Sequence, residues 1–406
     1  MFDYAVIGKG LIGSSAGRSL AQSSSRVAII GPDEPSHFAS HAGIFASHYD
    51  QGRITRILDA DWIWGTLAKR SIHQYADIEA DSGISFHHPV GALRVGHNTP
   101  DRIRYITQNK AVGQTLQATF QDYSRSELQQ QFPYFSFASD SIGLYETGGA
   151  GFINPRGLIQ AQLQCAQQRG ATVIREIAKD ISLEPDRCII HTQDGSRYDA
   201  QKVLVTTGAF TNFFSLIQRP LDLKPVAESI LLAELSESSL QAIRAPHGHA
   251  TSMPSLMYQF PDEHHDDRML AVYMVPPVEF PDGKTYLKIG VGSQRDRIFD
   301  SLENLTTWFK QGPDPATHDH IHALLTAIMP ELEIVATHVN PCVLTYTPTN
   351  YPFIDVIKPD RVFVATGGCG YAGKSSVEIG AIAARLTRHG TWVEDLDANL
   401  FKARWR

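Results

Sequence analysis

The sequence Tyr4-Ala5-Val6-Ile7-Gly8-Lys9-Gly10-Leu11-Ile12-Gly13 joins a short apolar run to a glycine-rich turn at the start of a helical pattern. That pattern continues to Gln22, and a second apolar run of the buried-strand type follows at Val27–Ile30. Strand, turn, helix and strand in this order form a βαβ unit. The glycines permit a tight turn, and the helix N-terminus offers free N–H groups to a pyrophosphate. We therefore predict a dinucleotide site that uses Gly8, Gly10, Leu11, Ile12 and Gly13.

The ribose end of this site departs from the common pattern. An acidic residue usually ends the second strand, but Gly31 stands there and Pro32-Asp33-Glu34 follows. Asp33 is predicted to reach the ribose from the loop, and Glu34 is an equivalent choice. A solvated turn without any cofactor contact is the alternative for both carboxylates.

A second glycine-rich turn lies at 366–376, between the apolar run Val362–Ala365 and a helical pattern at Ser375–Arg388. A flavin ring needs such a feature, because its reduction builds negative charge at N1 and the C2 carbonyl, which a helix N-terminus stabilises. A plain NAD dehydrogenase leaves this second turn unexplained. The cofactor is therefore predicted to be FAD. The turn is expected to contribute Gly367, Gly368, Gly370, Tyr371, Gly373 and Lys374.

The central part of the chain has a different pattern. From 220 to 300 the sequence alternates and is rich in turn residues, as in an antiparallel sheet. We predict an α/β fold, with a Rossmann-type, glutathione reductase-like FAD-binding domain and an interleaved mixed or antiparallel β-sheet substrate domain. The predicted boundaries are 1–90, 145–220 and 340–406 for the FAD-binding domain, and 91–144 and 221–339 for the substrate domain.

Composition narrows the classes of function. The 406 residues carry a net charge of −7, which gives no electrostatic reason to expect nucleic acid or an anionic membrane as partner. No apolar run reaches the roughly 18 residues that span a bilayer. Met1-Phe2-Asp3 leads directly into a strand without a signal peptide, so a cytoplasmic protein is expected. The four cysteines are far apart and the histidines lack metal-ligand spacing, so neither a disulfide framework nor a metal site is predicted.

A third stretch carries a family resemblance. The sequence from Cys342 to Pro348, followed by Phe353-Ile354-Asp355, resembles the C-terminal signature of monomeric sarcosine oxidase and its relatives. That group belongs to the glycine oxidase and D-amino acid oxidase superfamily of FAD-dependent amine oxidoreductases. The resemblance also covers the first βαβ unit, an Arg-x-x-Arg segment and the strand before Gly208-Ala209-Phe210, where Gly208 is taken as a cofactor contact.

The resemblance implies an activity and partners. We expect oxidation of a small amino acid or secondary amine that carries a carboxylate, of the sarcosine, glycine, N-methyl or cyclic amino acid type. Hydride transfer to flavin N5 would give an imine, and O2 would then be reduced to hydrogen peroxide. One alternative is a flavin-dependent amine dehydrogenase that passes electrons to a carrier. The other is a non-catalytic, dinucleotide-binding redox sensor, and the oligomeric state is left open.

The same resemblance suggests a covalent bond to the cofactor. Cys342 matches the cysteine that forms a thioether to the flavin 8α carbon in sarcosine oxidases. A covalent link retains the cofactor and raises its potential. A buried, inert thiol is the alternative for Cys342. His41 bears a fainter likeness to the histidine-linked flavin of dimethylglycine dehydrogenases.

Five residues are expected to act on the substrate or on oxygen. Arg53 matches the arginine that pairs with the substrate carboxylate, a task suited to its forked guanidinium, and Lys374 matches a second contact. Tyr273 resembles a tyrosine that faces the substrate, and Tyr49 replaces an active-site histidine. Lys288 matches the lysine over the flavin, where a fixed positive charge stabilises developing superoxide. Exposed structural charges are the alternatives for Arg53 and Lys374, and a surface lysine is the alternative for Lys288.

Overall fold

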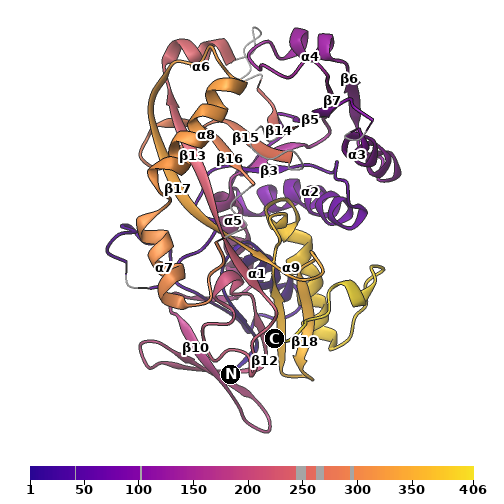
Figure 1. Cartoon of the computed structure of the whole chain (residues 1–406). Coiled ribbons are helices and arrows are strands. Elements are labelled where there is room, and N and C mark those ends of the chain that lie inside the picture. Colours follow the sequence, from indigo (N-terminus) through magenta and orange to yellow (C-terminus); the bar gives the residue numbers. More distant parts are fainter. Residues whose placement is uncertain (42, 101–102, 244–252, 262–268, 293–296) are drawn as a thin grey trace.

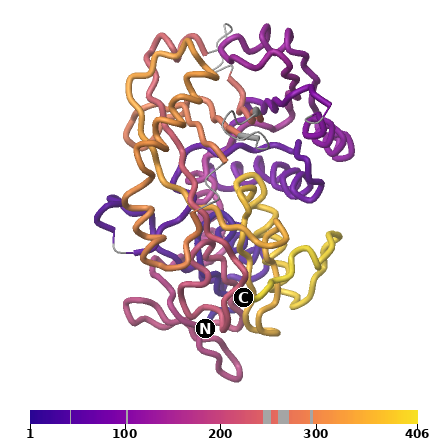
Figure 2. The backbone as a smooth tube through the Cα atoms, in the orientation of Figure 1, coloured from indigo at the N-terminus to yellow at the C-terminus, as the bar shows by residue number. Residues whose placement is uncertain are grey.

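The computed structural model describes residues 1–41, 43–100, 103–243, 253–261, 269–292 and 297–406. Two large sheets dominate the molecule. The molecule is elongated, and both termini lie in the lower half of the view in Figure 1. Indigo, magenta and orange segments occur in both halves, so the chain passes between them several times (Figure 2). The site therefore depends on segments that are far apart in the sequence.

The first sheet holds eight strands in the order β10-β11-β12-β1-β2-β9, and β19 extends it from β12 and pairs with β18. Neighbours are parallel from β19 through β12, β1 and β2 to β9. Both glycine-rich turns therefore leave the same edge of the sheet, after β1 and after β19. The strands are β1 (Phe2–Ile7), β2 (Val27–Ile30), β9 (Thr172–Ile174), β10 (Ala178–Leu183), β11 (Cys188–Thr192), β12 (Arg197–Val205), β18 (Phe353–Lys358) and β19 (Val362–Thr366).

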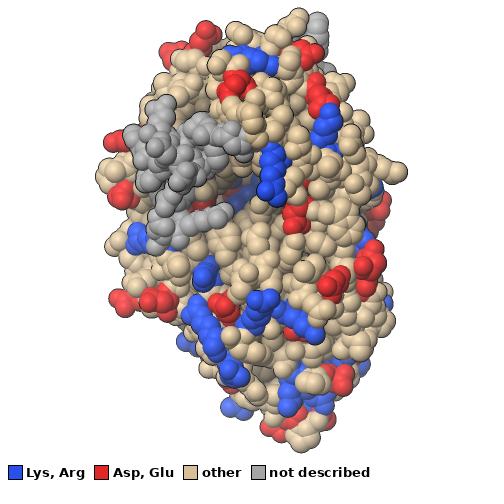
Figure 3. Space-filling view, turned by 45° about the vertical axis from the view of Figure 1, so that its right-hand side comes forward, with Lys and Arg blue, Asp and Glu red and all other residues tan. Residues whose placement is uncertain are grey.

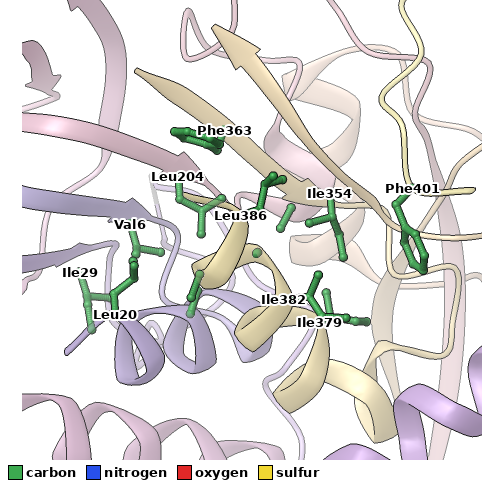
Figure 4. Close-up of a cluster of buried hydrophobic side chains, with 14 of the residues drawn as sticks. Val6, Leu20, Ile29, Leu204, Ile354, Phe363, Ile379, Ile382, Leu386 and Phe401 are labelled. Carbon is green, nitrogen blue, oxygen red and sulfur yellow. The ribbon is translucent and has the colours of Figure 1, made fainter. Parts of the chain in front are cut away.

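Four helices pack around this sheet: α1 (Leu11–Ala21), α2 (Trp62–Ser82), α5 (Pro155–Gln168) and α9 (Ala372–His389). Helices α1 and α9 cross closely, since a Cβ atom at Gly380 would lie only 2.5 Å from the carbonyl oxygen of Ile12. Apolar side chains of the parallel strands and of both helices form one buried core, in which Val6, Leu204 and Ile382 lie together (Figure 4). The core therefore fixes the starts of α1 and α9 relative to each other.

The second sheet also has eight strands, in the order β17-β13-β16-β15-β14-β5-β7-β6. Its neighbours are antiparallel except for the parallel pair of β14 and β5, so the sheet is mixed. One face packs on a second apolar core that includes α8 (Pro315–Ile328). The strands are β5 (Ala92–His97), β6 (Phe120–Tyr123), β7 (Ser141–Glu146), β13 (Lys224–Leu235), β14 (Ser255–Pro261), β15 (Met269–Glu279), β16 (Thr285–Val291) and β17 (Ile334–Tyr346).

Smaller elements complete the described part of the chain. A three-stranded sheet has the order β3-β8-β4 and is formed by β3 (Arg53–Thr55), β8 (Gly151–Ile153) and β4 (His87–His88). The remaining helices are α3 (Arg104–Thr115), α4 (Arg125–Gln131), α6 (Glu237–Ile243) and α7 (Leu302–Gln311), with short 3-10 turns η1 (Gly208–Phe210) and η2 (Ala398–Leu400).

The predicted fold class is confirmed by this arrangement of a parallel, helix-covered sheet and a mixed sheet. The predicted residue boundaries of the two domains stay a prediction. Among the helices that the structure describes, none has the length and apolar character needed to cross a membrane. Basic and acidic side chains are interspersed over the face drawn in Figure 3.

Candidate active site

An elongated cavity of about 210 Å³ lies where the two glycine-rich turns meet. Gly8, Gly10, Leu11 and Ile12 line it from the first turn. The second turn contributes Gly367, Gly368, Gly370 and Gly373, and the segment after β12 contributes Thr206, Thr207 and Gly208. The structure thus brings together residues that the sequence assigned to one cofactor from opposite ends of the chain.

The first turn accepts glycine only. Gly8 has φ +104°, a left-handed conformation, and a Cβ atom there would lie 2.5 Å from the carbonyl oxygen of Thr206. A Cβ at Gly13 would lie 1.7 Å from the carbonyl oxygen of Gly8. The Thr206 hydroxyl donates to the carbonyl oxygens of Ile7 and Gly8 at 2.9 and 2.8 Å, and so ties the turn to β12. Thr206 carries no motif of its own, which is why sequence reasoning missed it.

Two helix N-termini at the cavity lack a side-chain cap. Helix α1 begins after Gly10 and α9 after Tyr371, and neither has a capping side chain or an acidic residue in its first turn. By contrast, side chains of Asp61, Asn154 and Ser301 cap α2, α5 and α7. Uncapped N–H groups and the positive end of the helix dipole favour a negatively charged group. The two uncapped N-termini therefore fit a cofactor such as FAD, which has a negatively charged pyrophosphate and a ring that becomes negatively charged on reduction.

The residues expected at the ribose end are engaged by basic side chains. Asp33 pairs with Lys9 and lies 2.9 Å from Arg175 Nε. Glu34 forms a bidentate pair with Arg156, at 2.7 and 2.6 Å. A Cβ at Gly31 would lie 3.0 Å from the backbone nitrogen of Lys9, so there is little room for a larger residue where an acid is usual. The ribose role of Asp33 stays a prediction.

One face of the second sheet carries the remaining polar residues. Cys342 on β17 lies opposite Glu228 on β13, and Tyr273 on β15 lies opposite Gly290 on β16. The Tyr273 hydroxyl donates to Glu228 Oε1 at 3.4 Å. Its ring covers Gly290, where a Cβ would lie 2.2 Å from a ring carbon. Glycine at 290 is thus required for this orientation of Tyr273, and burial raises the pKa of its phenol.

Lys288 is fully buried, which rules out the alternative of a surface lysine. Its ammonium group donates to the carbonyl oxygen of Gly52 at 2.7 Å and pairs with Asp50. Burial lowers the pKa of Lys288, and the Asp50 charge opposes this. Burial alone would raise the pKa of Asp50, but Lys288 and Arg53 outweigh it, so the carboxylate is charged. Sequence reasoning missed Asp50, because no periodic pattern or motif marks it.

Arg53 lies at the start of β3 and lines the cofactor cavity. Its Nε lies 3.0 Å from Asp50 Oδ2, and its Nη2 lies 3.6 Å from Cys342 Sγ and donates to the carbonyl oxygen of Ser47. Arg53 is therefore no free surface charge. The structure joins Arg53, Asp50, Lys288 and Cys342 in one buried group.

Lys374 is also buried, and it pairs with Asp59 at 2.6 Å rather than lining the cavity. Arg56 Nη2 lies 3.5 Å from the same carboxylate oxygen. Burial lowers the pKa of Lys374 to about 7, and Arg56 acts in the same direction. Burial raises the pKa of Asp59, but the charges of Lys374 and Arg56 bring it down to about 2. Arg56 is the second arginine of the Arg-x-x-Arg segment. That motif is the feature of the sequence that could have identified Arg56 as a site residue.

The same buried cluster contains a further cation and a further carboxylate. Arg94 Nη2 donates to the carbonyl oxygen of Leu58 at 3.2 Å. Glu146 accepts hydrogen bonds from the backbone N–H groups of Ile57 and Leu58, and burial raises its pKa. When Lys374 is protonated, Arg56, Arg94 and Lys374 together therefore exceed the negative charge of Asp59 and Glu146.

Four other predicted residues have clear locations. The Cys342 side chain is buried, and its carbonyl oxygen accepts a hydrogen bond from Trp308 Nε1 at 2.9 Å. Tyr49 lines the cofactor cavity, whereas Tyr371 stacks on Trp64 with ring centres 4.9 Å apart. His41 Nε2 lies 2.9 Å from the carbonyl oxygen of Ile44 and does not line this cavity. No cluster of three or more metal-binding side chains occurs among the described residues.

Comparison with known proteins agrees with this geometry. The family model described as FAD dependent oxidoreductase matches residues 3–386. Monomeric sarcosine oxidase from Bacillus sp. (strain B-0618) is 23% identical, over 97% of this chain and 94% of the relative. N-methyl-L-tryptophan oxidase from Yersinia pestis (strain Pestoides F) is 21% identical, over 94% of each. The solved structure of NikD, described as an unusual amino acid oxidase, superposes with a TM-score of 0.73 and 17% identity, over 100% of this chain and 98% of NikD.

Proposed function

This chain belongs to the family of FAD-dependent oxidoreductases, and from that premise we propose that it oxidises the C–N bond of a small amine or amino acid carrying a carboxylate. The observation that carries the proposal is Arg53 in the lining of the cofactor cavity, joined through Asp50 to the buried cation Lys288. A redox sensor without turnover has no need of a buried carboxylate clamp. Relatives named as sarcosine and N-methyl-L-tryptophan oxidases support an N-substituted amino acid as substrate.

Each glycine-rich turn would hold a different part of the cofactor. The Gly8–Gly13 turn and the start of α1 would bind the pyrophosphate, and the 367–373 turn with the start of α9 would bind the pyrimidine ring. When bound, FAD supplies the redox chemistry, by accepting a hydride from the carbon next to nitrogen and returning two electrons to an acceptor such as O2. The protein's share is binding, orientation and electrostatics.

The substrate carboxylate is proposed to bind to Arg53 at the start of β3, with Lys374 at the start of α9 adding positive charge from outside the cavity lining. Arg53 lines the cavity, whereas Arg56 after β3, Arg94 on β5 and Lys374 on α9 form a buried cluster that does not line it. A guanidinium group meets a carboxylate in bidentate fashion. Tyr273, held over Gly290, would limit the space for the group on nitrogen. Fixing the carboxylate orients the C–H bond, which is worth several orders of magnitude in rate.

Lys288 is proposed to supply the positive charge that favours reduction of oxygen. Its ammonium group is held by Asp50 and the carbonyl oxygen of Gly52, so its position does not depend on the substrate. A charge that is fixed in a buried site stabilises developing superoxide without reorganisation. Cys342, which contacts Arg53, is proposed to link covalently to the flavin.

Anaerobic titration of the purified flavoprotein tests the proposal directly. We expect sarcosine, glycine, proline or pipecolate analogues to bleach the flavin absorbance, and subsequent admission of air to restore it with formation of hydrogen peroxide. Arg53→Ala and Arg56→Ala each remove a charge-assisted contact, worth about 2–4 kcal/mol or roughly 30- to 1,000-fold in binding. The variant that loses affinity for carboxylate inhibitors identifies the anchoring arginine. Unchanged affinity in both variants contradicts the carboxylate clamp, and the absence of bleaching with every amine contradicts the function.

A further inference from the structure

A second, larger cavity of about 730 Å³ adjoins the cofactor cavity. Ala46, Ser47, Tyr49 and Arg53 line both cavities, so one short segment of chain separates them. Cys342 lies in the wall of the larger cavity. Its volume falls in the range of sites for small organic ligands, about 300–1,000 Å³. A ligand in this cavity would be a direct neighbour of the cofactor.

The charged groups of this wall are already paired. Glu34 is held by Arg156, Asp50 by Arg53 and Lys288, and the carboxylate of Asp282 accepts the Tyr286 hydroxyl at 2.8 Å. The wall contains two cations, Arg53 and Arg156, and three carboxylates, Glu34, Asp50 and Asp282. Lys288 lies behind the wall and contacts Asp50. With this third cation, positive and negative charges are equal in number. A zwitterionic amino acid would find no surplus charge of either sign here. An uncharged ligand matches this wall best, because it leaves the existing ion pairs intact.

The wall also has a shape and polarity suited to a flat ring. Five phenylalanine and tyrosine side chains line the cavity: Phe38, Tyr49, Phe280, Tyr286 and Phe309. Aromatic rings bind a planar ligand by stacked or edge-to-face contacts. Asn340 on β17 offers an amide to the same cavity.

We propose that this cavity binds an uncharged, planar electron acceptor of the quinone class. A quinone has a flat ring and carbonyl oxygens, which match the aromatic wall and the amide donor of Asn340. Its reduction to the hydroquinone takes two electrons and two protons. The reduced cofactor would supply both electrons and one proton, as a hydride equivalent, and the solvent would supply the second proton. The inference rests on the proposed function only in that the cofactor is reduced; it adds a second substrate, bound apart from the amine.

Duroquinone, the tetramethyl-1,4-benzoquinone, is the appropriate probe. Every carbon next to a carbonyl group carries a methyl group, so the probe cannot add to the Cys342 thiol of molecules that lack the covalent flavin bond. Ser36 is exposed and lines the cavity, and Ser36→Trp introduces a bulky side chain there without disturbing a core. Ser40 is an exposed serine in the same loop that does not line the cavity, so Ser40→Trp is the matched control.

Two measurements use the oxidised and the photoreduced holoenzyme, so neither depends on an amine substrate. Equilibrium dialysis of duroquinone against the oxidised enzyme is expected to show one saturable site, weakened at least about tenfold in Ser36→Trp and unchanged in Ser40→Trp. In anaerobic stopped-flow experiments, the rate at which duroquinone reoxidises the photoreduced enzyme is expected to saturate with duroquinone concentration. Saturation should require a higher concentration in Ser36→Trp and the same concentration in Ser40→Trp. Absence of saturable binding, or equal behaviour of the two tryptophan variants, overturns the proposal. Failure of amines to bleach the flavin would instead reject the proposed amine oxidation and leave this test valid.

Discussion

Replacement of Lys288 by methionine is expected to lower the free energy of unfolding by about 3 kcal/mol, because the change removes one partner of a buried ion pair. The side chains of Lys288 and Asp50 are each 1% exposed, and the ammonium group also donates to the carbonyl oxygen of Gly52. Methionine keeps the apolar stem and similar volume, so the packing cost is small. Asp50 retains Arg53 as a cation, which places the cost at the lower end of the usual range of about 3–5 kcal/mol.

An exposed lysine provides a matched control, which separates the effect of burying an ion pair from the effect of removing a charge. Lys284 pairs with Glu234 at 2.6 Å, but these side chains are 50% and 20% exposed. Lys284→Met is therefore expected to cost less than about 1 kcal/mol. Urea unfolding of both variants, followed by circular dichroism, gives the comparison. Equal costs for the two lysine variants would refute the reasoning, because the Lys288 pair would then contribute no more than a surface pair.

The same substitution has a kinetic consequence. If the Lys288 charge acts on oxygen, reoxidation by O2 should slow by about 10²–10³-fold, the usual effect of losing one preorganised electrostatic contact. Flavin reduction by amine should slow far less, since the charge that this step uses is on the arginines. Stopped-flow measurement of the two half-reactions separates these effects. A loss confined to reduction would instead indicate that Lys288 contacts the amine.

Three further predictions follow from other parts of the site. Gly290→Ala should displace the Tyr273 ring, since the new Cβ would lie 2.2 Å from it, and should weaken substrate binding by at least about tenfold in titrations of flavin absorbance; unchanged affinity would mean that Tyr273 does not face the substrate. Carboxylate inhibitors should bind more weakly as pH rises through about 7, where buried Lys374 loses its proton, and Lys374→Met should remove this step; a flat wild-type profile would contradict a role for Lys374. Acid precipitation should leave FAD on the wild-type protein and release it from Cys342→Ser, as judged by mass analysis; free FAD from both proteins would exclude the thioether.

The sequence predicted the elements that have local signatures. Each glycine-rich turn stands between a strand and a helix, and the structure brings the two turns to one cavity. Alternation along β16 places Lys288 on the face opposite to Leu287 and Ile289, and both apolar side chains belong to the core of the second sheet. These features depend on residues close together in the chain, where periodicity and turn chemistry determine the outcome.

The charged contacts of the site could not be predicted from local patterns in the sequence. Asp50 and Asp59 lie in the segment around β3 and meet Lys288 and Lys374, which are more than two hundred residues away in the sequence. No periodic pattern encodes a pairing of this kind, because it depends on how two sheets and a helix pack. Arg56 was part of a quoted motif, yet only the shared contact with Asp59 connects it with Lys374.

The close crossing of α1 and α9 has a consequence for how the enzyme is made. Gly380 on α9 touches the backbone of α1, and β19 completes the parallel sheet beside β12. During synthesis, the first glycine turn emerges early, but the helix and strand that close the cofactor cavity emerge only after residue 360 has been translated. A nascent chain therefore has no complete cavity for most of its time on the ribosome. Insertion of the cofactor should be a late event in maturation, and chains that terminate before α9 should be unable to retain it.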